Sequence, residues 1–121
     1  MIFNLKYKVS KLKMSSSQYL VFSVVGMKYY GNHEFCLNDE EHITLKKESN
    51  NTHDRNAIKV LVKNNHVAYI SSEDNIKVNK FLKKNKEEQK QVDIEFFSSS
   101  EHRATFMLKG IQSNNQVTIQ S

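Results

Sequence analysis

The sequence predicts a small, mainly β domain with one main helix. Three observations lead to this prediction: short segments of alternating apolar and polar residues recur, a single stretch changes to helical spacing, and turn-forming residues separate the segments. The 121 residues have the length of one domain. Many short strands and one helix favour a curled sheet or small barrel of about six or seven strands, with the helix covering one end.

The expected strands follow from alternation and from β-branched content. Ile58, Val60 and Val62 would share one buried face, and Asn64–Asn65 would make the tight turn into the next strand. An alternating segment near the N-terminus makes residues 1–17 either a strand or an extension, so the compact domain would cover 18–121. The strands are expected at 19–27, 41–48, 56–64, 66–70, 91–97, 103–111 and 116–120, with a further one at 3–9.

Residues 72–85 are the one stretch with helical spacing. Val78, Phe81 and Leu82 would form a single apolar stripe. Ser71, followed three residues later by Asp74, is typical of a weak capping box. Acids near the start and lysines near the end agree with the helix dipole. These features predict the main helix.

Charge and composition narrow the functional classes. The net charge is +5, and sixteen of the eighteen basic residues are lysines, which suits a polyanion such as nucleic acid but also simple solubility in a lysine-biased genome. Both explanations stay open. No apolar run approaches the roughly 18 residues of a membrane helix. The single cysteine, Cys36, excludes an intrachain disulfide and suggests an intracellular protein.

The sequence contains no recognisable set of catalytic residues. Cys36 and His33 are the nearest approach to a thiol–imidazole pair, and no third partner is visible. The histidines show no ligand spacing, and three glycines cannot build a phosphate-binding loop. We therefore expect neither an enzyme nor a cofactor or metal.

Two polar or aromatic stretches are candidate binding sites. In "MKYYGN" a strand would present Lys28, Tyr29 and Tyr30, with one tyrosine entering the core and one at the rim. They are packing residues or a base-stacking platform, and packing is the commoner fate of tyrosine. In "SNNTHDRNAIKV" the side chains of Asn51 and Asp54 either organise the loop or accept a hydrogen bond from a ligand.

Three stretches together resemble the HIRAN domain family: "VVGMKYY" (24–30), "ITLKKESNNTHDRNAIKV" (43–60) and "HVAYI" (66–70). The resemblance implies an OB-fold-like β-barrel that binds single-stranded DNA at a free 3′ end. Such domains occur in fork-remodelling SWI/SNF-type translocases that serve DNA repair, and also as standalone modules. We therefore expect a monomer that works beside a helicase, a translocase or another repair protein, and that is nuclear or DNA-associated if the organism is eukaryotic.

The resemblance also implies roles for individual residues. Asp54 would accept a hydrogen bond from the 3′-hydroxyl, and Tyr29 and Tyr30 would hold the terminal nucleotides. The remaining expected contacts are Lys28, Asn51, His53, Tyr69, Ser72 and Phe96, with Phe97 as the alternative to Phe96. Two positions depart from the family pattern: His53 stands where a tyrosine is common, and Ser72 where a basic residue is common.

The chemistry of a carboxylate agrees with the implied role. An ionised aspartate only accepts hydrogen bonds, so it suits a terminal hydroxyl. An internal nucleotide offers a phosphodiester at the same place, which like charge repels. The alternative is a non-catalytic protein-interaction module on the same fold, with a degraded DNA pocket.

Overall fold

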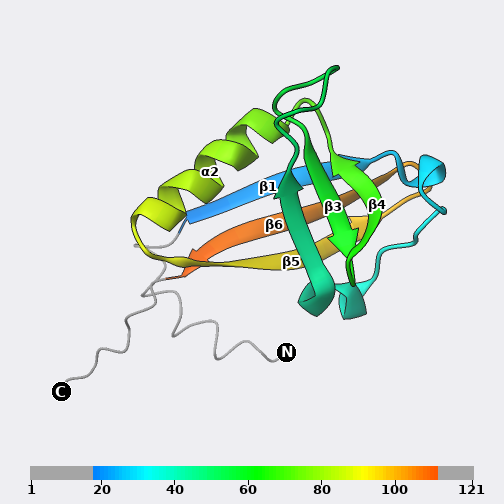
Figure 1. Ribbon diagram of the computed structural model, residues 1–121. Coiled ribbons are helices and arrows are strands. Elements are labelled where there is room, and N and C mark those ends of the chain that lie inside the picture. The colour runs from blue at the N-terminus through cyan, green and yellow to red at the C-terminus, as the bar shows by residue number, and fades with distance from the viewer. Residues whose placement is uncertain (1–17, 112–121) are drawn as a thin grey trace, which may run out of the picture.

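The structure is a computed structural model, and it describes residues 18–111 (Figure 1). Six strands form one antiparallel sheet in the order β2-β3-β4-β1-β6-β5. Two 3₁₀ helices and one α-helix complete the fold. In chain order the elements are β1 (Gln18–Val25), η1 (Met27–Tyr29), η2 (Leu37–His42), β2 (Ile43–Lys47), β3 (Ile58–Val62), β4 (Asn65–Ile70), α2 (Asn75–Glu87), β5 (Gln91–Ser99) and β6 (Arg103–Ile111).

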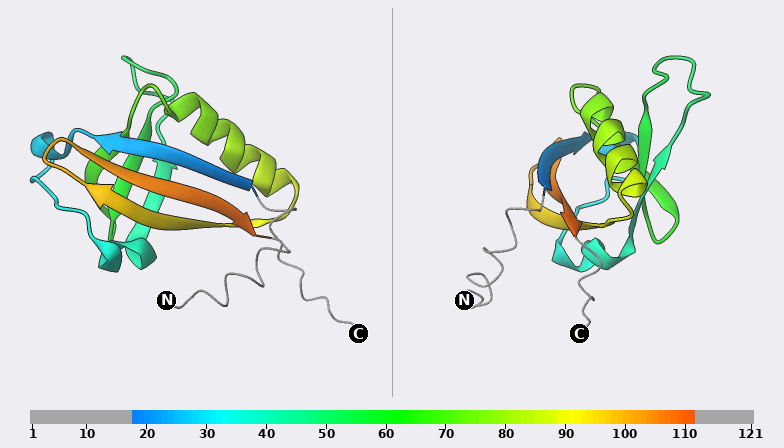
Figure 2. Two further views of the ribbon diagram at one scale, coloured as in Figure 1. Left: turned by 180° about the vertical axis from the view of Figure 1, so that it is seen from behind. Right: turned by 90° about the vertical axis from the view of Figure 1, so that its left-hand side faces the viewer.

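The sheet curls into a half-barrel, as the predicted fold class requires (Figure 2). Its first and last strands in space, β2 and β5, do not pair with each other in the described chain. Helix η2 fills part of this seam, where the Glu40 carboxylate accepts a hydrogen bond from the Phe96 amide at 2.7 Å. A side chain thus satisfies a backbone donor that a neighbouring strand would satisfy in a closed barrel.

The core lies inside this curl. Phe22 of β1 stacks on Phe106 of β6 with 5.9 Å between ring centroids, and Phe35 and Phe96 meet the same Phe106 ring edge-on. The predicted inward face of β3 is confirmed, because Ile58, Val60 and Val62 are all buried.

Helix α2 covers the end of the curl where β1 begins and β6 ends (Figure 1). The predicted apolar stripe is confirmed: Val78 is fully buried, and Phe81 and Leu82 pack against the core. Asn85, also fully buried, lies against Gly110 of β6. Helix and sheet approach closely there, since a side chain on Gly110 would overlap the Asn85 amide.

The predicted start of the helix is wrong by three residues. Asp74 stands at the N-cap position but its side chain makes no capping hydrogen bond, and the Ser71 hydroxyl accepts from the Glu73 amide, ahead of the helix. Instead the Ser71 amide donates to the Ser23 carbonyl at 2.8 Å, and the Asp74 carboxylate accepts from the Ser23 amide at 2.8 Å. Both residues are therefore committed to strand β1, and the regular helix begins only at Asn75.

Two further expectations need correction. The hairpin turn is formed by Lys63 and Asn64, which both have positive φ angles of 51° and 72°, and not by Asn64–Asn65. Strand β1 ends at Val25 because Gly26 adopts a φ of 86°, a conformation that favours glycine. The strands expected at 3–9 and 116–120 lie outside the described residues. Over residues 18–111, no helix is long and apolar enough to span a membrane.

Candidate nucleic-acid interface

The Lys28–Tyr29–Tyr30 stretch follows the Gly26 turn as a short 3₁₀ helix, η1, and not as a strand. Met27 is the residue that enters the core. Neither tyrosine does, contrary to the expectation of one buried ring: Tyr29 is 73% exposed and Tyr30 is 37% exposed. The ammonium group of Lys28 lies 5.2 Å from the Tyr29 ring centroid. An open aromatic face beside a cation is thus available to a ligand.

Tyr30 belongs to a cluster of three rings, with His66 and Tyr69 of β4. Its ring lies over His66 at 4.1 Å between centroids, and its edge meets Tyr69 at 6.0 Å. His66 and Tyr69 stand perpendicular to each other at 4.8 Å. Burial in this cluster lowers the pKa of His66, so the imidazole is neutral at physiological pH and stacks as an uncharged ring.

A β-bulge brings His66 and Tyr69 to the same side of β4. Val60 pairs with Ala68 and Leu61 pairs with His66, so Val67 has no partner on β3 in this register. Val67 and Ala68 both point into the core, and the residues on either side of them point outward. Sequence reasoning missed His66, because strict alternation places residue 66 on the same face as Ala68.

Glu48, at the end of β2, connects the ring cluster to the loop that follows. Its Oε1 atom accepts hydrogen bonds from the Tyr69 hydroxyl at 2.7 Å and from Asn51 Nδ2 at 2.9 Å. Lys59 Nζ lies 3.2 Å from the other carboxylate oxygen. These donors, Tyr69 first, lower the pKa of Glu48 to about 2, and the same contact raises the pKa of Tyr69. Glu48 is therefore ionised at physiological pH, and it holds the Tyr69 hydroxyl and the Asn51 amide in place.

Asn51 and Asp54 organise the loop between β2 and β3. Asn51 Oδ1 accepts from the backbone amides of His53 and Asp54 at 2.8 and 2.9 Å. The Asp54 carboxylate accepts from the Asn56 amide and, across 21 residues, from Asn75 Nδ2, both at 2.9 Å. One hydrogen bond reaches each carboxylate oxygen, and each oxygen keeps a lone pair for a further donor.

The side chains of the other expected residues take no part in the ring cluster or in the hydrogen bonds of the β2–β3 loop. His53 and Ser72 are exposed, and within residues 18–111 neither side chain has a partner. Phe96 packs against Phe106 in the core, so the structure does not place it with the three rings. His33 Nε2 lies 2.8 Å from the Asp39 carboxylate, which also accepts from the Cys36 amide. His33 and Cys36 thus stabilise the start of η2, and the described chain holds no cluster of metal ligands.

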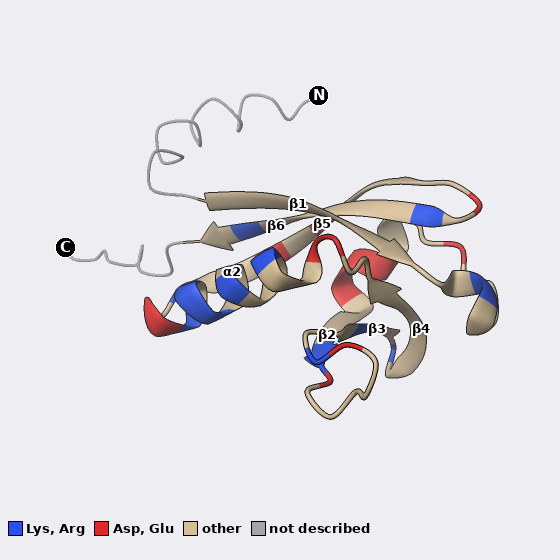
Figure 3. Ribbon diagram, turned by 90° about the horizontal axis from the view of Figure 1, so that it is seen from above, with Lys and Arg blue, Asp and Glu red and all other residues tan. Residues whose placement is uncertain are grey.

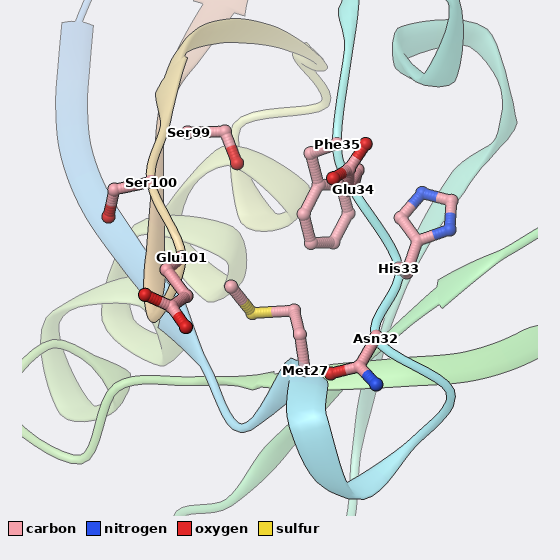
Figure 4. Close-up of a pocket in the computed structure, with 8 residues that line it drawn as sticks. All are labelled: Met27, Asn32, His33, Glu34, Phe35, Ser99, Ser100 and Glu101. Atoms are coloured by element: carbon pink, nitrogen blue, oxygen red, sulfur yellow. The ribbon is translucent and has the colours of Figure 1, made fainter.

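A cavity of about 610 Å³ opens between the segment after η1 and the β5–β6 turn (Figure 4). Glu34 and Glu101 both line it, and no lysine or arginine does. Carboxylates repel phosphate groups, so this cavity does not suit a polyanion. It is lined by Met27, Asn32, His33, Glu34, Phe35, Ser99, Ser100 and Glu101.

A family model for the HIRAN domain matches residues 17–119. The chain belongs to the HIRAN domain family. The crystal structure of the HIRAN domain of human HLTF is similar, with a TM-score of 0.58 and 24% sequence identity over 84% of this chain and 86% of that chain. At this identity the likeness concerns the fold. A comparison with curated protein sequences returned no match.

HIRAN domains are DNA-binding modules. In this HIRAN domain Tyr30, Tyr69 and His66 form one cluster, and the Glu48–Asn51 contact connects that cluster to the Asp54 loop. Lys28 and Tyr29 stand beside the cluster on η1, which immediately precedes Tyr30. Most of the residues for which the family resemblance implies a binding role thus lie in one region of the domain.

The charge of the chain is unevenly distributed. All thirteen acidic residues lie between Glu34 and Glu101, whereas four of the eighteen basic residues precede Gln18. This leaves fourteen basic residues against thirteen acidic ones in the described part of the HIRAN domain. Its folded surface is nearly balanced, and local clusters of charge therefore matter more than the total. The four early basic residues are Lys6, Lys8, Lys11 and Lys13.

Proposed function

We propose that this HIRAN domain binds single-stranded DNA without catalysis and recognises a free 3′-hydroxyl end. The observation that carries the proposal is the double contact of Glu48 Oε1 with Tyr69 and Asn51. It connects an exposed aromatic surface to a loop that holds a partly free carboxylate. A stacked terminal base and its sugar hydroxyl need these two elements at a fixed separation.

Asp54 is the group we assign to the 3′-hydroxyl. Its oxygens have one protein donor each and can accept one more, from the ligand. A chain-internal nucleotide would bring a phosphodiester to the same carboxylate, and two anions in contact repel. Selectivity for the 3′ end would then come as much from repulsion of internal phosphodiesters as from the hydrogen bond to the hydroxyl.

Tyr29 is the ring we assign to base stacking. It is the more exposed of the pair, and Lys28 beside it can meet a phosphate. Tyr30 is held by His66 and Tyr69 and would form the wall of the pocket. Ser72 supplies no positive charge, so few phosphate contacts and a shallow salt dependence are expected, at about −0.7 per phosphate in log–log slope.

The test is a titration of fluorescent oligothymidylates that differ only at the 3′ end. The unchanged protein should bind the 3′-hydroxyl form more tightly than the 3′-phosphate form. Asp54→Asn should weaken binding of the hydroxyl form and strengthen binding of the phosphate form, because the substitution removes the repelling charge. Equal affinities for both ends in the unchanged protein would overturn end recognition while leaving single-strand binding in place.

A further inference from the structure

Helix α2 carries five of the fourteen basic residues of the described chain, and they follow one another closely along the helix (Figure 3). Three of its lysines, Lys80, Lys83 and Lys86, line a groove of about 420 Å³ between the helix and strands β2 and β3. Lys47 lines the same groove from the end of β2. Within residues 18–111 none of these four ammonium groups forms an ion pair.

The floor of this groove is aliphatic. Leu45 of β2 and Leu82 of α2 are only partly buried, and Ile58 closes the base between them. The groove contains no aromatic ring on which a base could stack, and Asn79 is its one neutral polar side chain. Apolar surface enclosed by unpaired lysines is unfavourable in isolation, since like charges repel and the leucines remain in contact with water.

We infer that this groove is a docking site for an acidic peptide segment with aliphatic side chains. Leucine or isoleucine of the partner would cover Leu45 and Leu82, and aspartate or glutamate would pair with the surrounding lysines. A nucleic-acid backbone has the negative charge that would pair with the lysines, but it has no aliphatic side chain to cover the two leucines. Residues 1–17 and 112–121 contain no aspartate or glutamate, so neither segment supplies the acidic groups that this groove would bind.

The site is separate from the proposed DNA surface. None of its lining residues belongs to the ring cluster or to the Asp54 loop. It is close enough for the two to be used together, because Asn79 Nδ2 donates to the Asn56 carbonyl at the end of that loop. A partner protein could therefore hold the domain while the aromatic surface remains open to DNA.

The test uses a fluorescein-labelled peptide in which Asp and Glu alternate with Leu and Ile, followed by anisotropy on the full chain. We expect saturable binding that Lys83→Glu weakens at least about tenfold, the effect of a like charge within a charged rim. Lys84→Glu is the matched control: it makes the same charge change on the neighbouring exposed residue, which does not line the groove. It should alter binding less than about twofold.

Two further probes complete the test. A peptide with serine in place of Leu and Ile should bind much more weakly, and equal binding would mean that charge alone acts, which overturns the inference. An oligothymidylate should not displace the acidic peptide. If it does, and if Lys83→Glu weakens oligonucleotide binding as much as peptide binding, the groove is a phosphate path and the inference is wrong. Absence of saturable peptide binding also overturns it. None of these readouts depends on Asp54.

Discussion

Asn75 donates a hydrogen bond from Nδ2 to Asp54 Oδ2 at 2.9 Å, and so joins the β2–β3 loop to the first residue of helix α2. Asn75 is 2% exposed, so its side-chain amide cannot exchange this contact for one with water. The carboxylate that we assign to ligand recognition is therefore also a structural group.

Asn75→Ala separates these two roles. The substitution removes the donor and leaves the Asp54 carboxylate in place, still bonded to the Asn56 amide. We expect a loss of about 1–3 kcal/mol in the free energy of unfolding, the cost of breaking a buried hydrogen bond to a charged group, measured by urea denaturation. The preference for a 3′-hydroxyl over a 3′-phosphate should persist at a temperature where the variant is folded. Loss of that preference would show that Asp54 needs Asn75 to recognise an end.

Tyr29→Ala and Tyr30→Ala should have different effects. Tyr29 is 73% exposed, so its removal should leave the melting temperature unchanged and weaken oligonucleotide binding by about 1–3 kcal/mol, the worth of one stacked base. Tyr30 contacts His66 and Tyr69, and its removal should cost about 1 kcal/mol of stability. Calorimetry and anisotropy on both variants test this. Normal DNA binding by Tyr29→Ala would remove that residue from the site.

Glu48 should make the stability of the domain depend on pH in a defined range. Folding lowers the pKa of this carboxyl from its usual 4.5 to about 2, mainly through the Tyr69 hydrogen bond. A carboxyl with a depressed pKa stabilises the fold above its unfolded pKa, and the contribution disappears as pH falls through the folded one. The unchanged protein should thus exceed Glu48→Gln in stability above about pH 4.5, with the difference vanishing near pH 2. Urea midpoints across this range are the measurement, and a difference that is constant with pH would contradict the prediction.

Gly110→Ala should destabilise the packing of α2 on the sheet. The added methyl group would overlap the amide of fully buried Asn85, whose Oδ1 atom has no hydrogen-bond partner within residues 18–111. The expected cost is about 1–3 kcal/mol, typical of overpacking, and thermal unfolding measures it. Adding Asn85→Ala should restore part of the loss, since it frees the space that the methyl group needs. Additive effects of the two substitutions would show that they do not share one site.

Most of the fold could be predicted from the sequence, because six strands and the helix each have a clear hydrophobic period. The alternation of Ile58, Val60 and Val62 needs no knowledge of neighbouring strands, and it was confirmed. The start of the helix could not be predicted in the same way. Ser71 and Asp74 have the residue types of a cap, but both bond to Ser23, some fifty positions earlier in the chain.

Candidate site residues could be proposed from the sequence where a short family motif carries them, and not where tertiary contacts bring residues together. Tyr29, Tyr30, Asn51 and Asp54 are recognisable by their spacing. His66 could not be recognised in this way, because it reaches the ring cluster only through a β-bulge in β4, and no residue type indicates that bulge. The role of Glu48 as a connection between Tyr69 and Asn51 likewise depends on a hairpin register that the sequence does not display.

If the domain binds DNA as proposed, the uneven charge distribution assigns the association rate and the lifetime of the complex to different parts of the chain. Beyond a Debye length of about 8 Å at physiological salt, a partner responds mainly to net charge. Residues 18–111 are nearly balanced, so the folded surface exerts little long-range attraction of its own, and Lys6, Lys8, Lys11 and Lys13 supply most of the excess. Under the proposed function, the association rate should depend largely on these four lysines, and the lifetime of the complex on the ring cluster and Asp54.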